Sequence, residues 1–284
     1  MNETVIGMAH PGEMGAAVGA CLTQRGLSVL WASAGRSPST ADRAAGAGLR
    51  DVGSPGEMSS QADVIFSVCP PHAALEVARS VAGFRGIYVD ANAVSPATTR
   101  EVGEIVTAGG ASYVDGGIIG APPRKPGDSR LYLSGLWAEQ ISHLFADTPL
   151  DAQAIGNEIG QASAVKMAYA AWTKGTAALI LAIRALAHAE GVEQTLVAEW
   201  QQSQPALTAR PHAAARSAMQ KGWRWVAEME EIAATMAAAG LPPGFHQAAA
   251  AIYTRVPHTN TESPTSEPSL TTVINALLAE HSPA

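Results

Sequence analysis

Two glycines near the start of the chain have the spacing of a turn that binds a dinucleotide. In the stretch MAHPGEMG, residues 8–15, Gly12 and Gly15 occupy the second and third glycine positions of the pattern G-x-G-x-x-G, and His10 stands in the first. The second glycine allows a pyrophosphate to approach the backbone, and the third allows the following helix to pack closely on the strand. The retained glycines predict a nucleotide site, and an ordinary turn between a strand and a helix is the alternative. We expect the site to be formed by His10, Pro11, Gly12, Glu13 and Met14.

The segment that follows the second apolar run indicates which dinucleotide would bind. Enzymes that use NAD place Asp or Glu at this point for the ribose 2′-hydroxyl. The stretch WASAGRSPST, residues 31–40, has no carboxylate but contains Arg36, Ser37, Ser39 and Thr40. Because a guanidinium group and hydroxyls suit a 2′-phosphate, Arg36 and Ser37 predict NADP(H) as the cofactor. A solvated arginine in a turn is the alternative.

Such residues need a scaffold of alternating strands and helices, and the first half of the chain has that pattern. Compact, largely apolar runs suit buried parallel strands and lie at 4–9, 27–33, 62–70, 86–92 and 111–117. Amphipathic stretches lie between them at 13–25, 71–81 and 95–108, and Ser95 with Pro96 predicts a capped helix start. The pattern predicts a doubly wound, Rossmann-type α/β domain over residues 1–160.

The second half of the chain has a helical pattern throughout. From Gln161 to Glu190 the sequence is rich in Ala and free of Pro, which predicts one helix of unusual length. Further helical stretches lie at 192–202, 212–239, 244–253 and 270–280. We expect an all-α domain over residues 161–284, joined to the first domain by the long helix. The polar Pro/Ser/Thr segment at 254–269 is expected to be mobile.

Composition limits the kinds of partner. The chain has 284 residues, of which 47% are hydrophobic, and a formal charge of -7. Its 18 Lys and Arg residues are scattered, which argues against nucleic acid or an anionic membrane surface as a partner. We see no signal peptide and no uninterrupted apolar stretch long enough to span a membrane, and Cys21 and Cys69 lack the spacing of a metal or redox site. We therefore expect a cytoplasmic protein that holds no metal and takes a small-molecule substrate.

Four motifs occur in the order found in one enzyme superfamily. They are VCPPHAALE at 68–76, VDANAVSP at 89–96, VDGGIIGAPP at 114–123 and GQASAVKMAYAA at 160–171. Together they resemble the β-hydroxyacid dehydrogenase and 6-phosphogluconate dehydrogenase superfamily, over nearly the whole chain. The stretches at 166–182 and 222–245 are most similar to a subgroup with a distinct helical C-terminal domain. Imine reductases share this architecture.

The resemblance implies roles for particular residues. Lys166 falls on the catalytic lysine of the family, where an ammonium group polarises a carbonyl and passes a proton during hydride transfer. Asn92 takes the position beside the nicotinamide and the substrate, and Val68, Cys69 and Pro70 take that of a loop that binds the nucleotide. A surface lysine and a plain turn asparagine are the alternatives for Lys166 and Asn92.

The sequence departs from the family where simple hydroxyacids are bound. Ile118–Ala121 replaces a Ser-Gly-Gly segment, and Tyr169 with Ala170 stands in place of Asn-Asn after the lysine. Because these changes remove polar contacts, we expect a bulkier or more apolar substrate. Its expected contacts are Ile119, Gly120, Ala121, Lys166, Tyr169 and Thr173, the last three on one helix face. For Tyr169, Trp172, Trp223 and Trp225, a place in the core or in a dimer interface is the alternative.

The leading hypothesis is an NADP(H)-dependent oxidoreductase that interconverts a hydroxyl and a carbonyl group, with Lys166 as general acid/base and Asn92 and Tyr169 beside it. Imine reduction is the alternative within enzymes, although imine reductases usually have Asp or Tyr as the proton donor. A nucleotide-binding protein without turnover is the alternative of another class. We also expect a homodimer through the C-terminal helical domain, because the long helix exposes more apolar length than one domain can cover.

Overall fold

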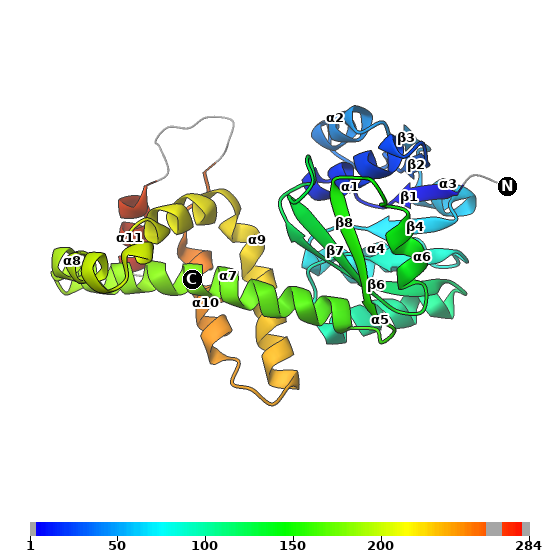
Figure 1. Cartoon of the computed structure of the whole chain (residues 1–284). Coiled ribbons are helices and arrows are strands. Elements are labelled where there is room, and N and C mark those ends of the chain that lie inside the picture. Colours follow the sequence, from blue (N-terminus) through cyan, green and yellow to red (C-terminus); the bar gives the residue numbers. More distant parts are fainter. Residues whose placement is uncertain (1–3, 260–268, 280–284) are drawn as a thin grey trace. The chain divides into compact units, whose positions relative to one another are not determined.

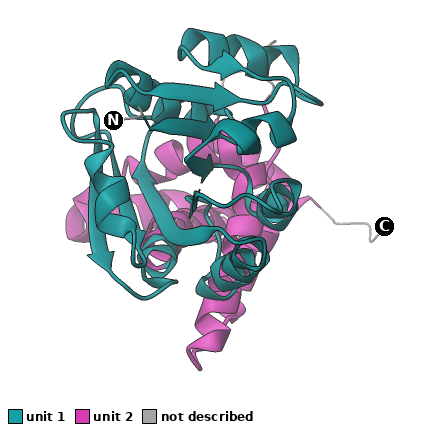
Figure 2. Cartoon of the chain, turned by 90° about the vertical axis from the view of Figure 1, so that its right-hand side faces the viewer, with its two compact units in different colours: residues 1–167 teal, residues 168–284 magenta. Residues whose placement is uncertain are grey.

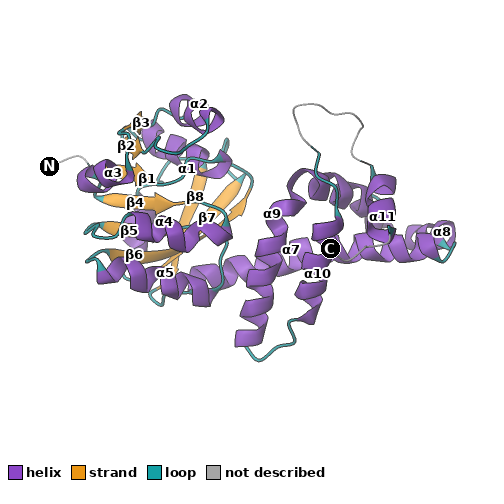
Figure 3. Cartoon of the chain, turned by 180° about the vertical axis from the view of Figure 1, so that it is seen from behind, coloured by secondary structure: helices purple, strands orange, loops and turns teal. Residues whose placement is uncertain are grey.

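The chain forms two compact units. The structure is a computed structural model that describes residues 4–259 and 269–279. The units are Met1–Met167 and Ala168–Ala284, so that the boundary falls inside one helix (Figure 2). The first unit is a sheet with helices and the second is helical, which confirms the predicted fold class (Figure 3).

The first unit is built on one sheet, which has eight strands within the described residues. In sheet order the neighbours are β3 (Arg50–Asp51), β2 (Ser28–Trp31), β1 (Val5–Met8), β4 (Val64–Ser67), β5 (Ile87–Asp90), β6 (Ser112–Gly120), β7 (Ser129–Ser134) and β8 (Leu150–Gly156). The pairs from β3 to β6 are parallel, β7 is antiparallel to β6, and β8 is parallel to β7 (Figure 1). The chain leaves β1 toward one edge and returns at β4 to build toward the other. The topological switch point, where doubly wound sheets bind ligands, therefore lies between β1 and β4.

Helices cover both faces of this sheet. One face packs against α1 (Glu13–Gln24), α2 (Pro38–Gly46) and α6 (Ala138–His143), and the other against α3 (Pro55–Gln61), α4 (Ala74–Ser80) and α5 (Pro96–Ala108). Three of these helices begin at a Ser-Pro pair. The side chains of Ser37, Ser54 and Ser95 each accept the backbone N–H three residues on, and the next residue is Pro. The predicted cap at Ser95 is confirmed, and the sheet is buried on both faces as its apolar strands require.

The second unit is made of α7 (Gln161–Ala189), which also forms the end of the first unit, and of α8 (Glu193–Ser203), α9 (Arg210–Ala238), α10 (Gly244–Arg255) and α11 (Leu270–Leu278). The predicted long helix agrees with α7 to within a residue. A largely buried ion pair of Lys174 with Glu228 joins α7 to α9, and the Tyr253 hydroxyl donates to the Lys174 carbonyl at 2.6 Å. These bonds tie α10 and α9 to one side of α7.

Two parts of the sequence-based description need correction. Thr254 and Arg255 lie in α10, and the Thr259 backbone N–H donates to the Met219 carbonyl at 3.1 Å, so the expected mobile segment begins as packed chain. The rest of that segment, residues 260–268, and Glu280 of the last predicted helix lie outside the described residues. Secondly, within the described residues α7 is long and apolar enough to cross a membrane by length and composition. Half of its apolar window is buried inside the protein.

Candidate nucleotide and catalytic site

The turn between β1 and α1 has the geometry that a pyrophosphate site needs. A Cβ on Gly15 would lie 2.3 Å from the His10 carbonyl oxygen, so only glycine allows α1 to begin this close to the strand. A Cβ on Gly12 would meet only the His10 ring, at 3.4 Å, and Gly12 has an ordinary extended backbone. Gly12 is therefore not required by the fold itself. Its lack of a side chain leaves open space at the start of α1, where a ligand would approach.

The start of α1 also supplies donors for an anion. Gly12 is the N-cap of α1, and no side chain within the described residues caps this helix. Free N–H groups and the helix dipole attract negative charge at such a position. Around the turn, Pro11 is buried, His10 and Met14 are half-buried and Glu13 is exposed. The turn therefore fits the diphosphate of a dinucleotide.

A cluster of cations and hydroxyls follows β2. Arg36 donates from its guanidinium to the Ala9 carbonyl at 3.2 Å, which brings it to the nucleotide turn. Arg43 donates to the Thr40 hydroxyl at 3.0 Å, and Thr40 and Ser39 each lie 3.1 Å from the Ser37 hydroxyl. Among the described residues, neither arginine pairs with a carboxylate. Two cations beside three hydroxyls at the start of α2 are groups that can bind a phosphate.

The pKa of His10 is affected by this positive charge. The residue is half-buried, and its Nδ1 atom is buried without a hydrogen-bond partner among the described residues. Burial, and then the Arg36 guanidinium, lower the pKa of His10 below its ordinary value, and Arg43 adds to the effect. His10 is therefore neutral at pH 7 and adds no charge to the turn.

A carboxylate also comes near the end of β2, from the next strand. Asp51 in β3 accepts the backbone N–H of Ser33 at 3.2 Å and of Gly53 at 2.8 Å through the same oxygen. These bonds lower the pKa of Asp51, so it is ionised at neutral pH. The residues that follow β2 in the sequence do not reveal this carboxylate, because Asp51 belongs to the neighbouring strand β3.

Asn92 joins the ends of β4 and β5. Its Oδ1 accepts the Cys69 backbone N–H at 2.6 Å, its Nδ2 donates to the Ser67 hydroxyl at 3.0 Å, and its own backbone N–H donates to Asp90 at 2.9 Å. The residue is buried. Because the amide is already bonded on both sides, its first role in the structure is to hold the loop of Val68, Cys69 and Pro70 against the neighbouring strand. Burial raises the pKa of the Cys69 thiol to about 12, so this cysteine is not a nucleophile at neutral pH.

Two buried carboxyl groups lie side by side next to this turn. Asp90 in β5 pairs in register with Asp115 in β6, and neither is exposed. Asp115 accepts hydroxyl donors from Thr99 at 3.1 Å, Ser134 at 2.9 Å and Ser163 at 2.6 Å, and backbone N–H donors from Gly160 at 2.9 Å and Ser163 at 3.1 Å. Asp90 accepts one backbone N–H through Oδ1, and its Oδ2 has no partner among the described residues. Burial, together with the charge of Asp115, raises the pKa of Asp90 to about 7. Asp115 therefore has five hydrogen-bond donors, whereas Asp90 has one.

Asp115 positions the start of the helix that carries Lys166. Gly160 and Ser163 open α7, and their N–H groups are held by a carboxylate that β6 fixes in the sheet. Two residues further along β6, a Cβ on Gly117 would lie 2.7 Å from the Ala162 carbonyl and 2.9 Å from Lys166 Cβ. The helix therefore rests directly on the strand backbone at this point. Lys166, half-buried, is held just beyond the register position of Asp90, at the end of the sheet where Asn92 lies.

The residues expected to contact substrate are spread over two elements. Ile119 and Gly120 belong to β6, and Ala121 follows it; Ile119 is buried and the other two are exposed. The segment 118–120 is thus a strand paired with β7 rather than a loop. Tyr169 and Thr173 lie on α7, one and two turns after Lys166, and Tyr169 is about half exposed.

The sequence alone did not single out four residues of this site. Arg43 lies on the helix that begins at Ser37, and its spacing of seven from Arg36 on a helical pattern was the available signal. Asp115 and Gly117 stand in the motif VDGG, and the sequence does not reveal that the start of α7 rests on this strand. For Asp51 the sequence holds no signal, since it reaches the site through strand pairing.

Comparison with known families agrees with this geometry. Residues 4–126 match the NAD binding domain of 6-phosphogluconate dehydrogenase. This part of the chain is therefore similar to that family. Residues 187–256 match a domain of unknown function, DUF1932. The match of residues 4–126 agrees with a nucleotide site at the modified glycine turn.

Relatives of known sequence and structure place the whole chain in the same fold. An uncharacterised 28.5 kDa protein of Methanothermus fervidus is 29% identical over 164 residues, which are 57% of this chain and 63% of that protein. A conserved protein of unknown function, described as structurally similar to 3-hydroxyacid dehydrogenases, is 28% identical, with a TM-score of 0.66 over 89% of this chain and 96% of that one. The 3-hydroxyisobutyrate dehydrogenase of Mycobacterium tuberculosis, solved with L-serine, is 18% identical, with a TM-score of 0.71 over 98% of this chain and 100% of that one. Imine reductases share the fold as well. The chain thus has the fold of NAD(P)-dependent dehydrogenases related to 6-phosphogluconate dehydrogenase.

Proposed function

We propose that this chain is an NADP(H)-dependent oxidoreductase that interconverts a hydroxyl and a carbonyl group, with Lys166 as the general acid/base. The observation that carries the proposal is the placement of Lys166 by Asp115 and Gly117 at the end of the sheet where the nucleotide turn lies. The nicotinamide supplies or removes a hydride when bound. The side chains of the protein have to bind the nucleotide, orient the substrate and move one proton.

The preference for NADP(H) rests on the cluster after β2. A 2′-phosphate would be held by the Arg36 and Arg43 guanidinium groups and by the hydroxyls of Ser37, Ser39 and Thr40. Charge-assisted hydrogen bonds of this kind are about twice as strong as neutral ones. The Ser37 hydroxyl oxygen already accepts the Thr40 backbone N–H as the cap of α2, and its O–H group would donate to the phosphate.

The role of Lys166 follows from the charge that reduction of a carbonyl creates. When the carbonyl carbon gains a hydride, negative charge develops on oxygen, and an ammonium group beside that oxygen stabilises the charge and then donates the proton. In the opposite direction the neutral amine accepts the proton of the hydroxyl. Tyr169, one turn further on α7, is the second candidate for a proton donor. The replacement of polar substrate contacts by Ile119 and Ala121 favours a substrate with an apolar body.

The test is reduction of carbonyl compounds by NADPH, with Lys166→Met as the variant and Lys221→Met as the matched control, because Lys221 is exposed on α9. A panel of ketones, ketoacids and cyclic imines is followed by loss of NADPH absorbance. We expect turnover of a ketone or ketoacid, a decrease in kcat of about 10²–10⁴-fold in Lys166→Met, and unchanged NADPH affinity.

Other outcomes contradict the proposal in distinct ways. Turnover of imines alone assigns the chain to imine reduction. Tight NADPH binding without turnover on any class assigns it to nucleotide binding without catalysis. Unchanged kcat in Lys166→Met removes Lys166 from the mechanism and leaves Tyr169 as the proton donor to be tested next.

A further inference from the structure

Strand β7 carries two polar side chains on the sheet face where α7 begins. Side chains alternate between the two faces of a strand, and in β7 Leu131 and Leu133 belong to the core on the face that α1 covers. Arg130 and Tyr132 therefore lie on the opposite face. That face is the one on which the helix starts, because it also carries Asp115, which binds the first turn of α7.

Strand pairing brings these two residues beside the position of Lys166. Gly117 pairs in register with Tyr132, and a Cβ on Gly117 would lie 2.9 Å from Lys166 Cβ. Arg130 is the next residue of β7 on the same face, and diagonal neighbours on a sheet face lie about 7–8 Å apart. Because Lys and Arg side chains are long, Lys166 and Arg130 can contact opposite ends of one small molecule.

The Arg130 guanidinium is not engaged by the protein. The side chain is half-buried, yet within the described residues it has no hydrogen bond or ion pair. Its register neighbour on β8 is Asp151, whose carboxylate accepts the Gln153 side-chain amide at 2.7 Å. On the other side, its register neighbour in β6 is the apolar Ile119. A guanidinium with its donors unused is suited to the two oxygens of a carboxylate.

The neighbours of Arg130 add an apolar surface and a hydroxyl. Ile119 is buried, and Tyr132 is half-buried with a hydroxyl that has no hydrogen bond in the part of the chain that the structure describes. Ile119 and Ala121 belong to the segment in which the sequence lacks the polar substrate contacts that the family resemblance implies. Arg130 lies across the strand from this segment and can supply a charged contact in its place.

We propose that Arg130 binds a carboxylate of the substrate and thereby selects oxo acids and hydroxy acids over neutral compounds. This role rests on the proposed function, because it concerns the far end of the molecule whose carbonyl or hydroxyl group faces Lys166. Ile119 contacts the apolar body of such a substrate, and the Tyr132 hydroxyl lies between the two cations. Arg130 sets specificity and orientation and takes no part in proton transfer.

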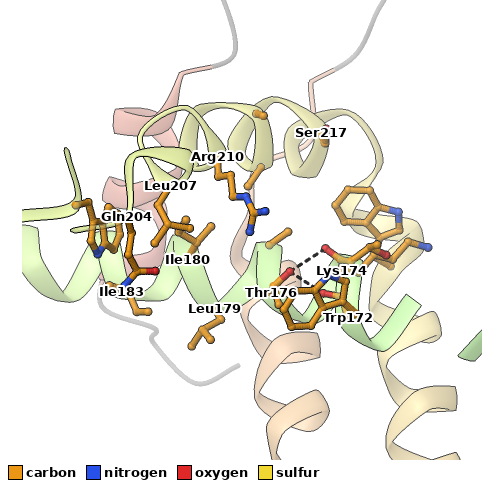
Figure 4. A pocket seen from close by; sticks show the side chains of 16 residues that line it. Trp172, Lys174, Thr176, Leu179, Ile180, Ile183, Gln204, Leu207, Arg210 and Ser217 are labelled. Atoms are coloured by element: carbon orange, nitrogen blue, oxygen red, sulfur yellow. Dashed lines mark hydrogen bonds between the residues drawn. The ribbon is translucent and has the colours of Figure 1, made fainter. Parts of the chain in front are cut away.

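The helical unit contains a second place where an acid could bind. A cavity of about 700 Å³ lies among α7, α8 and α9, with an apolar lining that includes Trp172 and Leu179 (Figure 4). Arg210 points into it from the start of α9. Lys166 does not line this cavity. Arg210 is therefore the matched control for Arg130, since each arginine borders a different candidate place for the carboxylate.

The first experiment measures binding without turnover. Pyruvate, acetoacetate and phenylpyruvate are each compared with their methyl esters by calorimetry, on the chain saturated with NADP⁺, which cannot reduce them. We expect the native chain and Arg210→Gln to bind at least one acid about 10–100-fold more tightly than its ester. Arg130→Gln is expected to bind that acid and its ester equally, with an unchanged circular dichroism spectrum and melting temperature.

The second experiment measures reduction of the same compounds by NADPH. Arg130→Gln should raise KM for the oxo acid about 10–100-fold at a kcat close to that of the native chain, and leave KM for the ester unchanged. Arg130→Lys keeps the cation but not the paired donors, so it should restore part of the preference for the acid. NADPH affinity should be the same in all of these variants.

Three results overturn the assignment of Arg130. Equal binding of every acid and its ester to the native chain shows that no carboxylate is recognised. A preference for the acid that survives in Arg130→Gln but is lost in Arg210→Gln or Lys166→Met assigns the carboxylate to that other cation. Weaker NADPH binding in Arg130→Gln assigns the arginine to the nucleotide. Acid binding that depends on Arg130 without any turnover contradicts the proposed reaction alone, and turnover without a preference for acids contradicts the role of Arg130 alone.

Discussion

Asp115 binds Ser163 through both of its carboxylate oxygens: Oδ1 accepts the Ser163 hydroxyl at 2.6 Å, and Oδ2 accepts the Ser163 backbone N–H at 3.1 Å. The first residue belongs to the sheet and the second to the first turn of α7. A helix start that would otherwise have free N–H groups is thus fixed to a buried strand. Since Lys166 follows Ser163 by three residues, the same bonds fix the proposed proton donor.

Replacing Asp115 should destabilise the first unit strongly. Asp115→Ala leaves five donors without an acceptor, two of them backbone N–H groups, and we expect a loss of at least about 3 kcal/mol in the free energy of unfolding measured in urea. Asp63→Asn is the matched control, because exposed Asp63 accepts one backbone N–H from Val5 at the opposite end of the strands, and it should cost less than about 1 kcal/mol. Equal losses in the two variants would show that the Asp115 network adds little.

Adding a methyl group at Gly117 should move Lys166 without unfolding the chain. A Cβ at this position would lie 2.9 Å from Lys166 Cβ, so Gly117→Ala has to push α7 away from β6. Because a misplacement of about 1 Å can lower a rate 10²-fold, we expect kcat to fall by about 10–100-fold at unchanged NADPH affinity. Gly46→Ala in α2, where a Cβ meets nothing within 4 Å, should keep kcat and gain up to about 1 kcal/mol of stability. If Gly117→Ala retains full kcat, the contact between helix and strand does not position the lysine.

The two arginines after β2 should set the preference for the phosphorylated nucleotide. Arg36→Ala and Arg43→Ala are each expected to weaken NADPH binding about tenfold or more, because each removes one charge-assisted contact worth roughly 1.5–3 kcal/mol. NADH affinity, measured by calorimetry on the same variants, should change little. Equal losses for both nucleotides would mean that neither arginine contacts the 2′-phosphate. Tight NADH binding that is lost in Asp51→Asn would instead identify Asp51 as the group that binds the ribose.

Asp90 should make stability fall as the pH rises through neutrality. Its pKa is raised from 3.8 to about 7 in the folded chain, so between these values the folded state keeps a proton that the unfolded state loses. Stability is then highest below about pH 4 with respect to this group, and the decrease by pH 8 amounts to about 4 kcal/mol. Asp90→Asn cannot ionise and should be more stable than the native chain at pH 8 but not at pH 4. Melting temperatures at the two values test this, and a constant difference between the variants would contradict it.

The alternating pattern of the first half was sufficient to predict the layers, because each buried parallel strand is a short apolar run with a clear end. The strands β3, β7 and β8 were not predicted. β8 is mostly exposed along Asp151–Ile155, so its sequence lacks the apolar run that marked the inner strands. The extension of β6 to Gly120 was also missed, since Gly116 and Gly117 have low strand propensity and are retained for close packing.

In the candidate site too, residues that are local in the sequence could be predicted, and contacts between distant residues could not. Gly12, Gly15 and Arg36 could be found from spacing, because a turn and the residues after it are local in the sequence. The bond of Asp115 to Ser163 spans 48 residues, and the approach of Asp51 to Ser33 depends on strand pairing. The internal bonds of the Asn92 amide likewise depend on the neighbouring strand, so the sequence could suggest a polar role for it but not its partners.

The two glycines of the nucleotide turn differ in what a genetic experiment can learn from them. Gly15 cannot change without disturbing the fold, because its missing Cβ would overlap the His10 carbonyl at 2.3 Å. Gly12 borders open space, so its replacement by a larger residue should yield a folded chain that no longer accepts a nucleotide. A cell that carries such an allele separates the functions that need nucleotide binding from those that need only the folded protein.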